Sequence, residues 1–172
     1  MAITNETVLD PSIDRRLAVD LDASERDELI AYLDTRGNWT CGRGHLMPRP
    51  APGRSWEGFT VIQSTSDRWF STDIMNAMRL AQNWPEFSSC DTDCRKNALT
   101  ELAFNMAHRW EAFGPTRAAI TAKDWQTVHD HLLASLWAKE VQTHGVKAPD
   151  GVELPGRATR IANYFLSGEY PA

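Results

Sequence analysis

The sequence predicts an α+β fold with a small N-terminal lobe that carries a β-hairpin and a larger helical C-terminal lobe. Between Asp34 and Pro52 there are six glycines and prolines, which disfavour a helix and favour short strands joined by turns. Beyond residue 90, apolar residues recur every three or four positions, as they do on one face of a helix. The length of 172 residues suffices for one domain, or for two small lobes, with a hydrophobic core.

Composition and charge exclude several classes of protein. Hydrophobic residues make up 42% and charged residues 24% of the chain, as in ordinary soluble domains. No apolar run approaches the roughly 20 residues of a membrane-spanning helix, and we expect no signal peptide because the first residues lack its basic and apolar regions. The net charge is −5, with −6 on the half up to Cys94 and +1 on the rest. Neither half has the basic face that nucleic-acid binding needs, so we expect neither nucleic acid nor membrane as a partner.

The small lobe is expected over about residues 21–70, after an N-terminal extension of residues 1–20. The extension is polar and acidic, and it contains a short helical pattern around Ser12–Val19. The helical lobe is expected over about residues 71–172. It begins with a weaker helical pattern that is clearest at Ser71–Gln82, where the apolar residues fall on one side.

The second half of the chain predicts four further helices. The first is capped by Asp91 or Thr92 and runs to about Ala112, and its wide apolar stripe marks it as the buried central helix. Gly114-Pro115 breaks it. The remaining predictions are helices over Thr116–Thr121, Asp124–Thr143 and Arg157–Leu166, with a loop rich in glycine and proline over 144–156.

The residues that carry chemistry lie close together in the small lobe. Glu25 is followed after eight residues by Asp34, after five more by Thr40, and then by Gly42-x-Gly44-His45. The glycines allow a tight hairpin, which should bring Asp34 and Thr40 side by side on adjacent strands with Glu25 across a cleft. Hydrolysis of a glycosidic bond needs such a pair of carboxyl groups, one protonated for the leaving oxygen and one ionised to aim a water or stabilise charge.

This spacing resembles the signature of the phage-type, T4 lysozyme-like muramidases (glycoside hydrolase family 24). The signature reads Glu, eight residues, Asp, five residues, Thr, then Gly-x-Gly-His. The resemblance covers about residues 22–170 and is sparse between Leu46 and Ser88. Its other matching positions are Leu29, Tyr32, Gly37, Arg95, Ala98-Leu99, Phe104-Asn105-Met106-Ala107, Phe113, Thr116, Trp125, Trp137, Arg157-Ala158-x-Arg160, Phe165 and Gly168.

The resemblance implies a lysozyme-like fold and a hydrolase that cleaves the β-1,4 bond between N-acetylmuramic acid and N-acetylglucosamine in peptidoglycan. Cleavage would proceed with inversion and without a cofactor or metal. Glu25 would be the general acid, Asp34 would position or activate the water, and Thr40 would help to hold it. Arg157 would be a supporting arginine that pairs with Glu25. The implied substrate-binding residues are Gly44, His45, Phe104, Asn105 and Thr116.

The resemblance also implies peptidoglycan as the partner and the cell wall as the place of action. Without a signal peptide, the protein would be an endolysin kept in the host cytoplasm until holin release, or a lysozyme carried in a phage virion. The N-terminal extension favours docking to phage tail or baseplate proteins. The acidic charge also favours a virion component, because a free enzyme would gain from a basic field that draws it to anionic cell walls.

The alternative is a catalytically inactive lysozyme-fold protein that serves as a structural or peptidoglycan-binding component of a phage particle. Arg26 and Ala107 stand where the family usually has glycine. Residues 24–33 also fit a capped helix, and on one continuous helix Glu25 and Asp34 would point to opposite faces. Catalysis therefore requires the helix to stop near Glu25 and the chain to turn before Tyr32.

Several other residues have simpler interpretations. His45 should order its own loop by a backbone hydrogen bond. Cys90 and Cys94 are expected to be buried or partly buried free thiols. His129 and His131 would point apart on a helix, which opposes a zinc site. Trp125 and Trp137 are expected to anchor the core of the helical lobe, and Trp39 is a candidate for the cleft.

Overall fold

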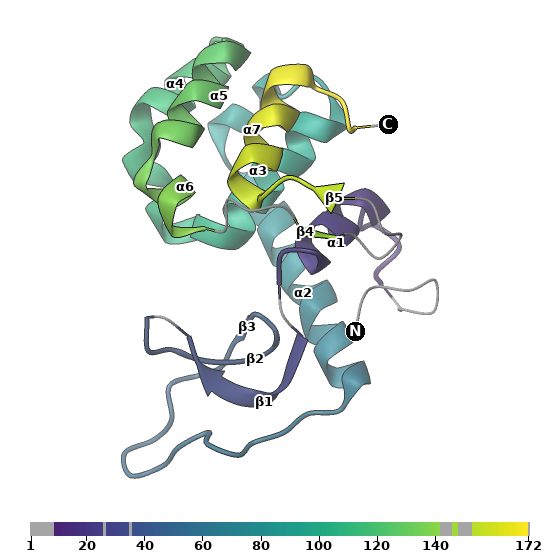
Figure 1. Ribbon diagram of the computed structural model, residues 1–172, viewed down its shortest axis with the longest axis vertical. Coiled ribbons are helices and arrows are strands. Elements are labelled where there is room, and N and C mark those ends of the chain that lie inside the picture. The colour runs from purple at the N-terminus through teal and green to yellow at the C-terminus, as the bar shows by residue number, and fades with distance from the viewer. Residues whose placement is uncertain (1–8, 26, 35, 142–145, 148–152, 172) are drawn as a thin grey trace. The chain divides into compact units, whose positions relative to one another are not determined.

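The computed structural model describes residues 9–25, 27–34, 36–141, 146–147 and 153–171 (Figure 1). Over these residues the chain combines α-helices with small antiparallel sheets, in the α+β class that the sequence predicts. It divides into two compact units, Met1–Met75 and Asn76–Ala172. None of the helices in the described ranges is both long and apolar enough to cross a membrane.

The first unit begins with helix α1 (Arg15–Asp22), most of which falls in the stretch expected to be an extension. Asp14 caps the helix, because its Oδ1 accepts hydrogen bonds from two backbone N–H groups of the first turn at 2.8 and 3.1 Å. Leu17 and Leu21 are fully buried. The residues of α1 that were expected to belong to an extension are therefore helical and packed into the first unit.

Three strands form the antiparallel sheet of the first unit in the order β1 (Asp27–Leu33), β2 (Trp39–Arg43) and β3 (His45–Leu46). The first residue of β1 lies opposite the last residue of β2, and the last lies opposite the first. The register shifts between Glu28 and Tyr32. The hairpin that the glycines predict is thus present.

The alternative helix over residues 24–33 is wrong. Helix α1 ends at Asp22, and residues 27–33 are an extended strand. This strand pairs with β2, and an isolated bridge joins Ile30 to Thr60. The hydrogen bonds to β2 and the bridge to Thr60 outweigh the helical preference of these residues, because intrinsic helix propensity is weak and tertiary contacts override it.

A small core fills the first unit. Its buried members are Ala31 from β1, Cys41 from β2 and Met47 just after β3. The partly buried side chains that pack against it are Trp39, Trp56, Val61 and Trp69.

Helix α2 (Gln63–Gln82) begins earlier than the predicted Ser71. Its first two turns bury Ser66 along with Phe70. A small polar residue on the buried face hides the apolar repeat, which explains why the sequence pattern is clear only from residue 71. Residues of α2 up to Met75 belong to the first unit, and the remainder belong to the second.

The second unit is mostly helical. Its elements in chain order are the 3-10 turn η1 (Pro85–Ser89), α3 (Asp93–Met106), the 3-10 segment η2 (Ala107–Phe113), α4 (Gly114–Thr121), α5 (Trp125–Ala134), α6 (Leu136–Glu140), the paired strands β4 (Val146–Lys147) and β5 (Glu153–Leu154), and α7 (Arg157–Ser167). The predicted central helix stops at Met106 rather than Ala112 because the next residues tighten into η2. Pro115 then lies in the first turn of α4, where its missing N–H costs nothing.

The predicted helix over Asp124–Thr143 is two helices, with the end of the prediction outside the described residues. Ser135 separates α5 from α6, since its backbone is extended and its hydroxyl oxygen accepts a hydrogen bond from the N–H of Ala138 at 3.1 Å. The predicted loop 144–156 contains the short pair β4 and β5, and its other residues up to 152 also lie outside the described part.

The core of the second unit is built around α3, as the apolar stripe predicts. Ala98, Leu99 and Leu102 on this helix are fully buried. Trp137 is 2% exposed, and Trp125 is partly buried against the same core. Both tryptophans are therefore the core anchors that we expected.

Candidate active site

Glu25 lies in the loop between α1 and β1, and the last turn of α1 holds its backbone. Its N–H donates to the carbonyl oxygens of Leu21 at 3.1 Å and Asp22 at 3.3 Å. Beside it, the hydroxyl of Ser24 donates to the carbonyl oxygen of Asp20 at 2.9 Å. The helix thus ends before Glu25, as catalysis by this residue requires, and the side chain is half-buried.

The carboxylate of Glu25 lies against Gly44, the residue between β2 and β3. A β-carbon at position 44 would lie 2.9 Å from Oε2 of Glu25 and 3.3 Å from its Cδ. Gly44 also has a φ of +75°, in the left-handed region that favours glycine. Glycine is needed here for the turn between the strands and again for the close approach of the carboxylate. The structure therefore brings together two residues that the sequence assigns to the site.

Asp34 begins the turn that joins β1 to β2. Its Oδ1 accepts hydrogen bonds from the backbone N–H groups of Arg36 at 2.9 Å and Asn38 at 2.7 Å, and its Oδ2 accepts one from Asn38 Nδ2 at 3.2 Å. Burial by itself would raise the pKa of Asp34, but the hydrogen bonds from Asn38 and Arg36, helped by the charge of Arg36, bring this pKa below its ordinary value. Asp34 is therefore an ionised carboxylate at neutral pH.

Thr40 lies opposite Tyr32 in the hairpin rather than opposite Asp34. The expectation that Asp34 and Thr40 sit side by side on adjacent strands is wrong, because Asp34 is in the turn and donates its N–H to the carbonyl oxygen of Asn38 at 2.8 Å. The hydroxyl of Thr40 donates to the same carbonyl oxygen at 3.4 Å. The two residues are therefore linked through Asn38, and Thr40 is buried.

Among the described residues, the ring of His45 bonds to a carboxylate and not to the backbone of its own loop as expected. Its Nδ1 lies 2.8 Å from Oδ2 of Asp73, and its ring stacks on Trp69 with 4.4 Å between the centroids. Both partners belong to α2, so the early start of that helix supplies the stacking partner. The imidazole thus joins β3 to α2.

Arg43 is the residue that sequence reasoning missed. Its side chain is 1% exposed and lies among three carboxylates. Burial by itself would lower the pKa of Arg43, but Asp67, Asp22 and Asp27 raise it above its ordinary value, so the guanidinium is charged. The signal in the sequence is an arginine between two glycines, Gly42 and Gly44, in a strand, and acidic residues close to Glu25 on both sides.

Three of the predicted site residues, Arg157, Asn105 and Phe104, lie on α7 and α3 of the second unit. Nη1 of Arg157, at the start of α7, donates to Oδ1 of Asn105 in the last turn of α3. The amide nitrogen of Asn105 donates to the carbonyl oxygen of Glu101 at 3.1 Å. Phe104 is partly buried against the core. The expected pairing of Arg157 with Glu25 joins residues of different units and stays a prediction.

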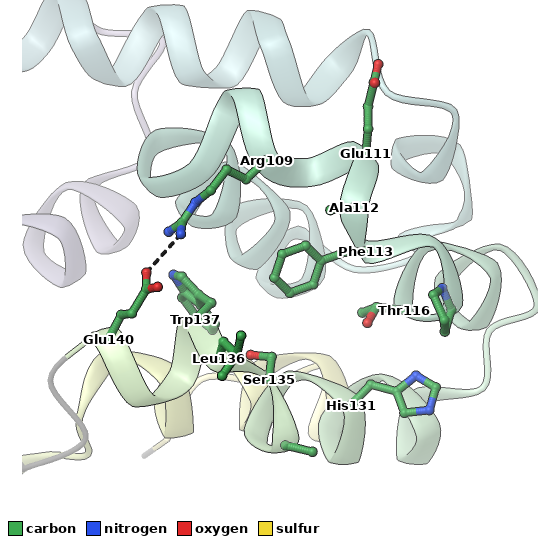
Figure 2. A pocket seen from close by; sticks show the side chains of 12 residues that line it. Arg109, Glu111, Ala112, Phe113, Thr116, His131, Ser135, Leu136, Trp137 and Glu140 are labelled. Atoms are coloured by element: carbon green, nitrogen blue, oxygen red, sulfur yellow. Dashed lines mark hydrogen bonds and ion pairs between the residues drawn. The ribbon is translucent and has the colours of Figure 1, made fainter. Parts of the chain in front are cut away.

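A groove of about 760 Å³ opens in the second unit between η2, α4, α5 and α6 (Figure 2). Thr116 lines it, whereas Phe104 and Asn105 are not among its described lining residues. Figure 2 shows the ion pair of Arg109 and Glu140 at one end, with 2.9 Å between Nη1 and Oε2, and Thr116 toward the other. Of the substrate-binding residues predicted in this unit, Thr116 is thus the one that lines this groove within the described part of the chain.

One polar group in this groove is notable. Trp137 lines the groove with Phe113 and Leu136, and its indole N–H is buried with no acceptor among the described residues. Buried donors in native proteins are nearly always paired with protein, water or a ligand. The indole N–H is itself inaccessible, so what the groove presents to a bound molecule is mainly the apolar side chains of its lining.

A smaller hollow of about 550 Å³ lies in the first unit beside the turn of Asp34. Gly37 and Asn38 from that turn line it, together with Trp39, Leu46, Met47, Pro48, Arg49 and Pro50. Trp39, the tryptophan that we considered for the cleft, thus lies next to the residue that holds Asp34.

Within the described part of the chain, no group of three or more His, Cys, Asp or Glu residues is arranged to hold a metal. The three cysteines, Cys41, Cys90 and Cys94, are buried and free, as expected for Cys90 and Cys94. Burial raises the pKa of Cys90 to about 12. Since the thiolate is the nucleophile, Cys90 is chemically inert at neutral pH.

No protein-family model matches the chain. The first unit has one carboxyl group seated on a glycine, Glu25, and a second that is kept ionised by a turn, Asp34. Two carboxyl groups in different environments are suited to acid and base roles in the same reaction.

Proposed function

We propose that this protein is a peptidoglycan hydrolase with a lysozyme-like fold, similar to the T4 lysozyme-like muramidases. The observation that carries the proposal is the carboxylate of Glu25 seated on Gly44, since both belong to the Glu-Asp-Thr-Gly-x-Gly-His signature. The α+β class supports it, with a small sheet-bearing unit followed by a helical unit around α3.

In the proposed reaction, Glu25 gives its proton to the glycosidic oxygen, which leaves as the 4-hydroxyl group of N-acetylglucosamine. Asp34 takes a proton from a water that attacks C1 of N-acetylmuramic acid from the opposite face. The old C1–O bond breaks as the new one forms, and the configuration at C1 inverts. The hydrogen bonds to Asp34 support its role because they keep it ionised, and Thr40 helps to hold the water.

Substrate binding is proposed for both units. In the second unit, the aromatic ring of Phe113 suits the apolar face of a sugar, and Thr116 is proposed to bind a sugar oxygen. Phe104 and Asn105 are proposed to contact the saccharide, with Arg157 supporting Glu25. In the first unit, Gly44 and His45 are proposed to contact the saccharide.

The biological setting that we propose is a phage. The protein would act on the cell wall as an endolysin released by a holin, or as a lysozyme of the virion docked to tail or baseplate proteins through its N-terminal residues. The net charge of −5 favours the virion, because delivery by a particle makes long-range attraction to an anionic wall unnecessary. Mass spectrometry of purified particles distinguishes the two settings.

The decisive experiment measures release of reducing ends from purified peptidoglycan. The wild type should be active, and E25Q and D34N should each lose at least about a hundredfold, in the range of general acid–base catalysis. E28Q is the matched control, because Glu28 is an exposed acid on β1. NMR of the first product should show the α-anomer of N-acetylmuramic acid. An inactive wild type, or an E25Q variant with undiminished activity, would contradict the proposal.

The second candidate is an inactive lysozyme-fold protein that binds peptidoglycan or builds a phage particle. The observation in its favour is that Asp34 already accepts three hydrogen bonds within its own turn, which is also what a purely structural turn residue does. Of the two departures from the family, Arg26 lies outside the described residues and Ala107 begins η2. Binding of the wild type to insoluble peptidoglycan without release of reducing ends would favour this candidate.

A further inference from the structure

The guanidinium of Arg43 makes three ion pairs. Nε lies 2.6 Å from Oδ1 of Asp22, Nη1 lies 2.5 Å from Oδ1 of Asp67, and Nη2 lies 3.3 Å from Oδ2 of Asp27. The group also lies over the ring of Phe70, with 5.4 Å from Cζ to the centroid. Charge-assisted hydrogen bonds of this kind are short and directional, so they restrict where each partner can lie.

Two of these carboxylates stand at the two ends of the loop that carries Glu25. Asp22 is the last residue of α1, and Asp27 is the first residue of β1. One buried side chain therefore holds both ends of a loop of four residues. Arg43 is also the neighbour in sequence of Gly44, on which the carboxylate of Glu25 rests. Arg43, the last residue of β2, thus binds both ends of the loop, and the next residue, Gly44, contacts the carboxylate that the loop carries.

Helix α2 supplies the rest of the arrangement. Asp67 binds Arg43 from this helix, and the hydroxyl of Ser66 donates to Oδ1 of Asp27 at 2.7 Å. Nε2 of Gln63 donates to Oδ2 of Asp27 at 2.6 Å. Asp27 is therefore held by both β2 and α2, and Asp22 binds Arg43.

We propose that Arg43 is the positioning residue of Glu25: by binding Asp22 and Asp27 it keeps the loop between α1 and β1 in the one geometry that seats the Glu25 carboxylate on Gly44. This inference rests on the proposed function. A buried ion pair adds little net stability compared with well-packed apolar side chains. The contribution that requires the charge is therefore the placement of the loop.

The test compares two isosteric variants of the same cluster, D22N and D67N. Each removes one carboxylate that binds Arg43, at 2.6 and 2.5 Å, but only Asp22 belongs to the end of the Glu25 loop. Misplacement of a catalytic group by about 1 Å can cost a hundredfold in rate. We expect D22N to lower kcat on peptidoglycan fragments at least about tenfold with KM within about twofold, and D67N to keep kcat within about threefold.

Substitution of the arginine itself gives a second measurement. R43Q should lower kcat as D22N does, and R43K should recover part of it, because lysine keeps a charge but not the planar fork that reaches several carboxylates. Equal losses of kcat in D22N and D67N, in proportion to their losses of stability, would overturn the proposal and indicate a merely structural cluster.

A crystal structure of D22N separates this proposal from the proposed function. The carboxylate of Glu25 should leave Gly44 in D22N, and an unmoved carboxylate would overturn the positioning role whatever the activity. If the wild type hydrolyses nothing, the function is wrong, and the position of Glu25 in D22N still decides whether Arg43 positions it. If the wild type is active and E25Q is not, unchanged kcat in D22N and R43Q overturns the positioning role alone.

Discussion

Glu25 and Gly44 touch so closely that no side chain fits between them. A β-carbon on Gly44 would come within 2.9 Å of Oε2 of Glu25, a distance that real β-carbons do not adopt. Because the contacting atom is the end of a flexible side chain, a larger residue at position 44 would displace the carboxylate. The relationship can therefore be tested by a single methyl group.

The G44A variant should lose activity through displacement of Glu25. The left-handed φ of +75° adds a backbone cost of about 1–2 kcal/mol for alanine. Gly53 is the matched control, since its φ is +73° and nothing lies within 4 Å of its β-carbon position. Urea unfolding should show similar losses of stability in G44A and G53A. Release of reducing ends should fall at least about tenfold in G44A alone, and equal activities in the two variants would contradict the contact.

Asp34 should make stability depend on pH. Its pKa is lower in the folded protein than in the unfolded chain, so the stabilisation by its charge is present above the unfolded value of about 3.9 and is lost as the pH falls through the folded value. D34N keeps the shape but removes the charge. Urea unfolding of D34N and the wild type should show a difference in free energy at pH 7 that shrinks below about pH 4. A difference that stays constant down to pH 3 would show that the charge is not responsible.

The buried ion pair of Arg160 and Glu101 should be more important for stability than the exposed pair of Arg109 and Glu140. In both pairs the nitrogen and oxygen are 2.9 Å apart, but the first pair is 1% exposed on each side and the second 39% and 50%. E101Q should lower the free energy of unfolding by about 3–5 kcal/mol, because the charge of Arg160 is left buried without this counter-charge. E140Q should lower it by less than about 1 kcal/mol. Chemical denaturation of the two variants makes the comparison, and losses of equal size would refute it.

Cys90 should resist thiol reagents for as long as the protein is folded. Burial excludes the reagent and raises the pKa of this thiol to about 12, so the reactive thiolate is scarce even at pH 9. Labelling by a maleimide, read by mass spectrometry at pH 7 and pH 9, should be slow in buffer and rapid in denaturing urea. Rapid labelling of Cys90 in the native protein would contradict this burial.

Local patterns predict the second unit better than the first. The apolar stripe around Leu99 identifies α3 as central because a helix turns every 3.6 residues and so places these residues on one buried face. The alternative helix over residues 24–33 fails for the opposite reason. A capped start and apolar residues at helical spacing favour a helix there, but the pairing with β2 and the bridge to Thr60 stabilise a strand instead. Local propensity contains no information on such partners.

The candidate site shows the same division. The spacing of Glu25, Asp34 and Thr40 could be read from the sequence, and so could the need for glycine at position 44. The link between Asp34 and Thr40 could not, because the N–H of Asp34 and the hydroxyl of Thr40 both donate to the backbone carbonyl oxygen of Asn38. Every residue has these groups, so no side-chain pattern predicts them.

By itself, the sequence determined the α+β class, the hairpin after Asp34 and the buried helix at α3, since these depend on residue types at short spacings. Only the tertiary structure decided that residues 27–33 are a strand, that Glu25 rests on Gly44, and that Arg43 holds Asp22 and Asp27. The contact of Glu25 with Gly44 and the ion pairs of Arg43 with Asp22 and Asp27 join residues that lie about 15 to 20 positions apart. The energies of these features come from strand pairing and from charges brought together in a buried place, and both arise only when the chain is folded.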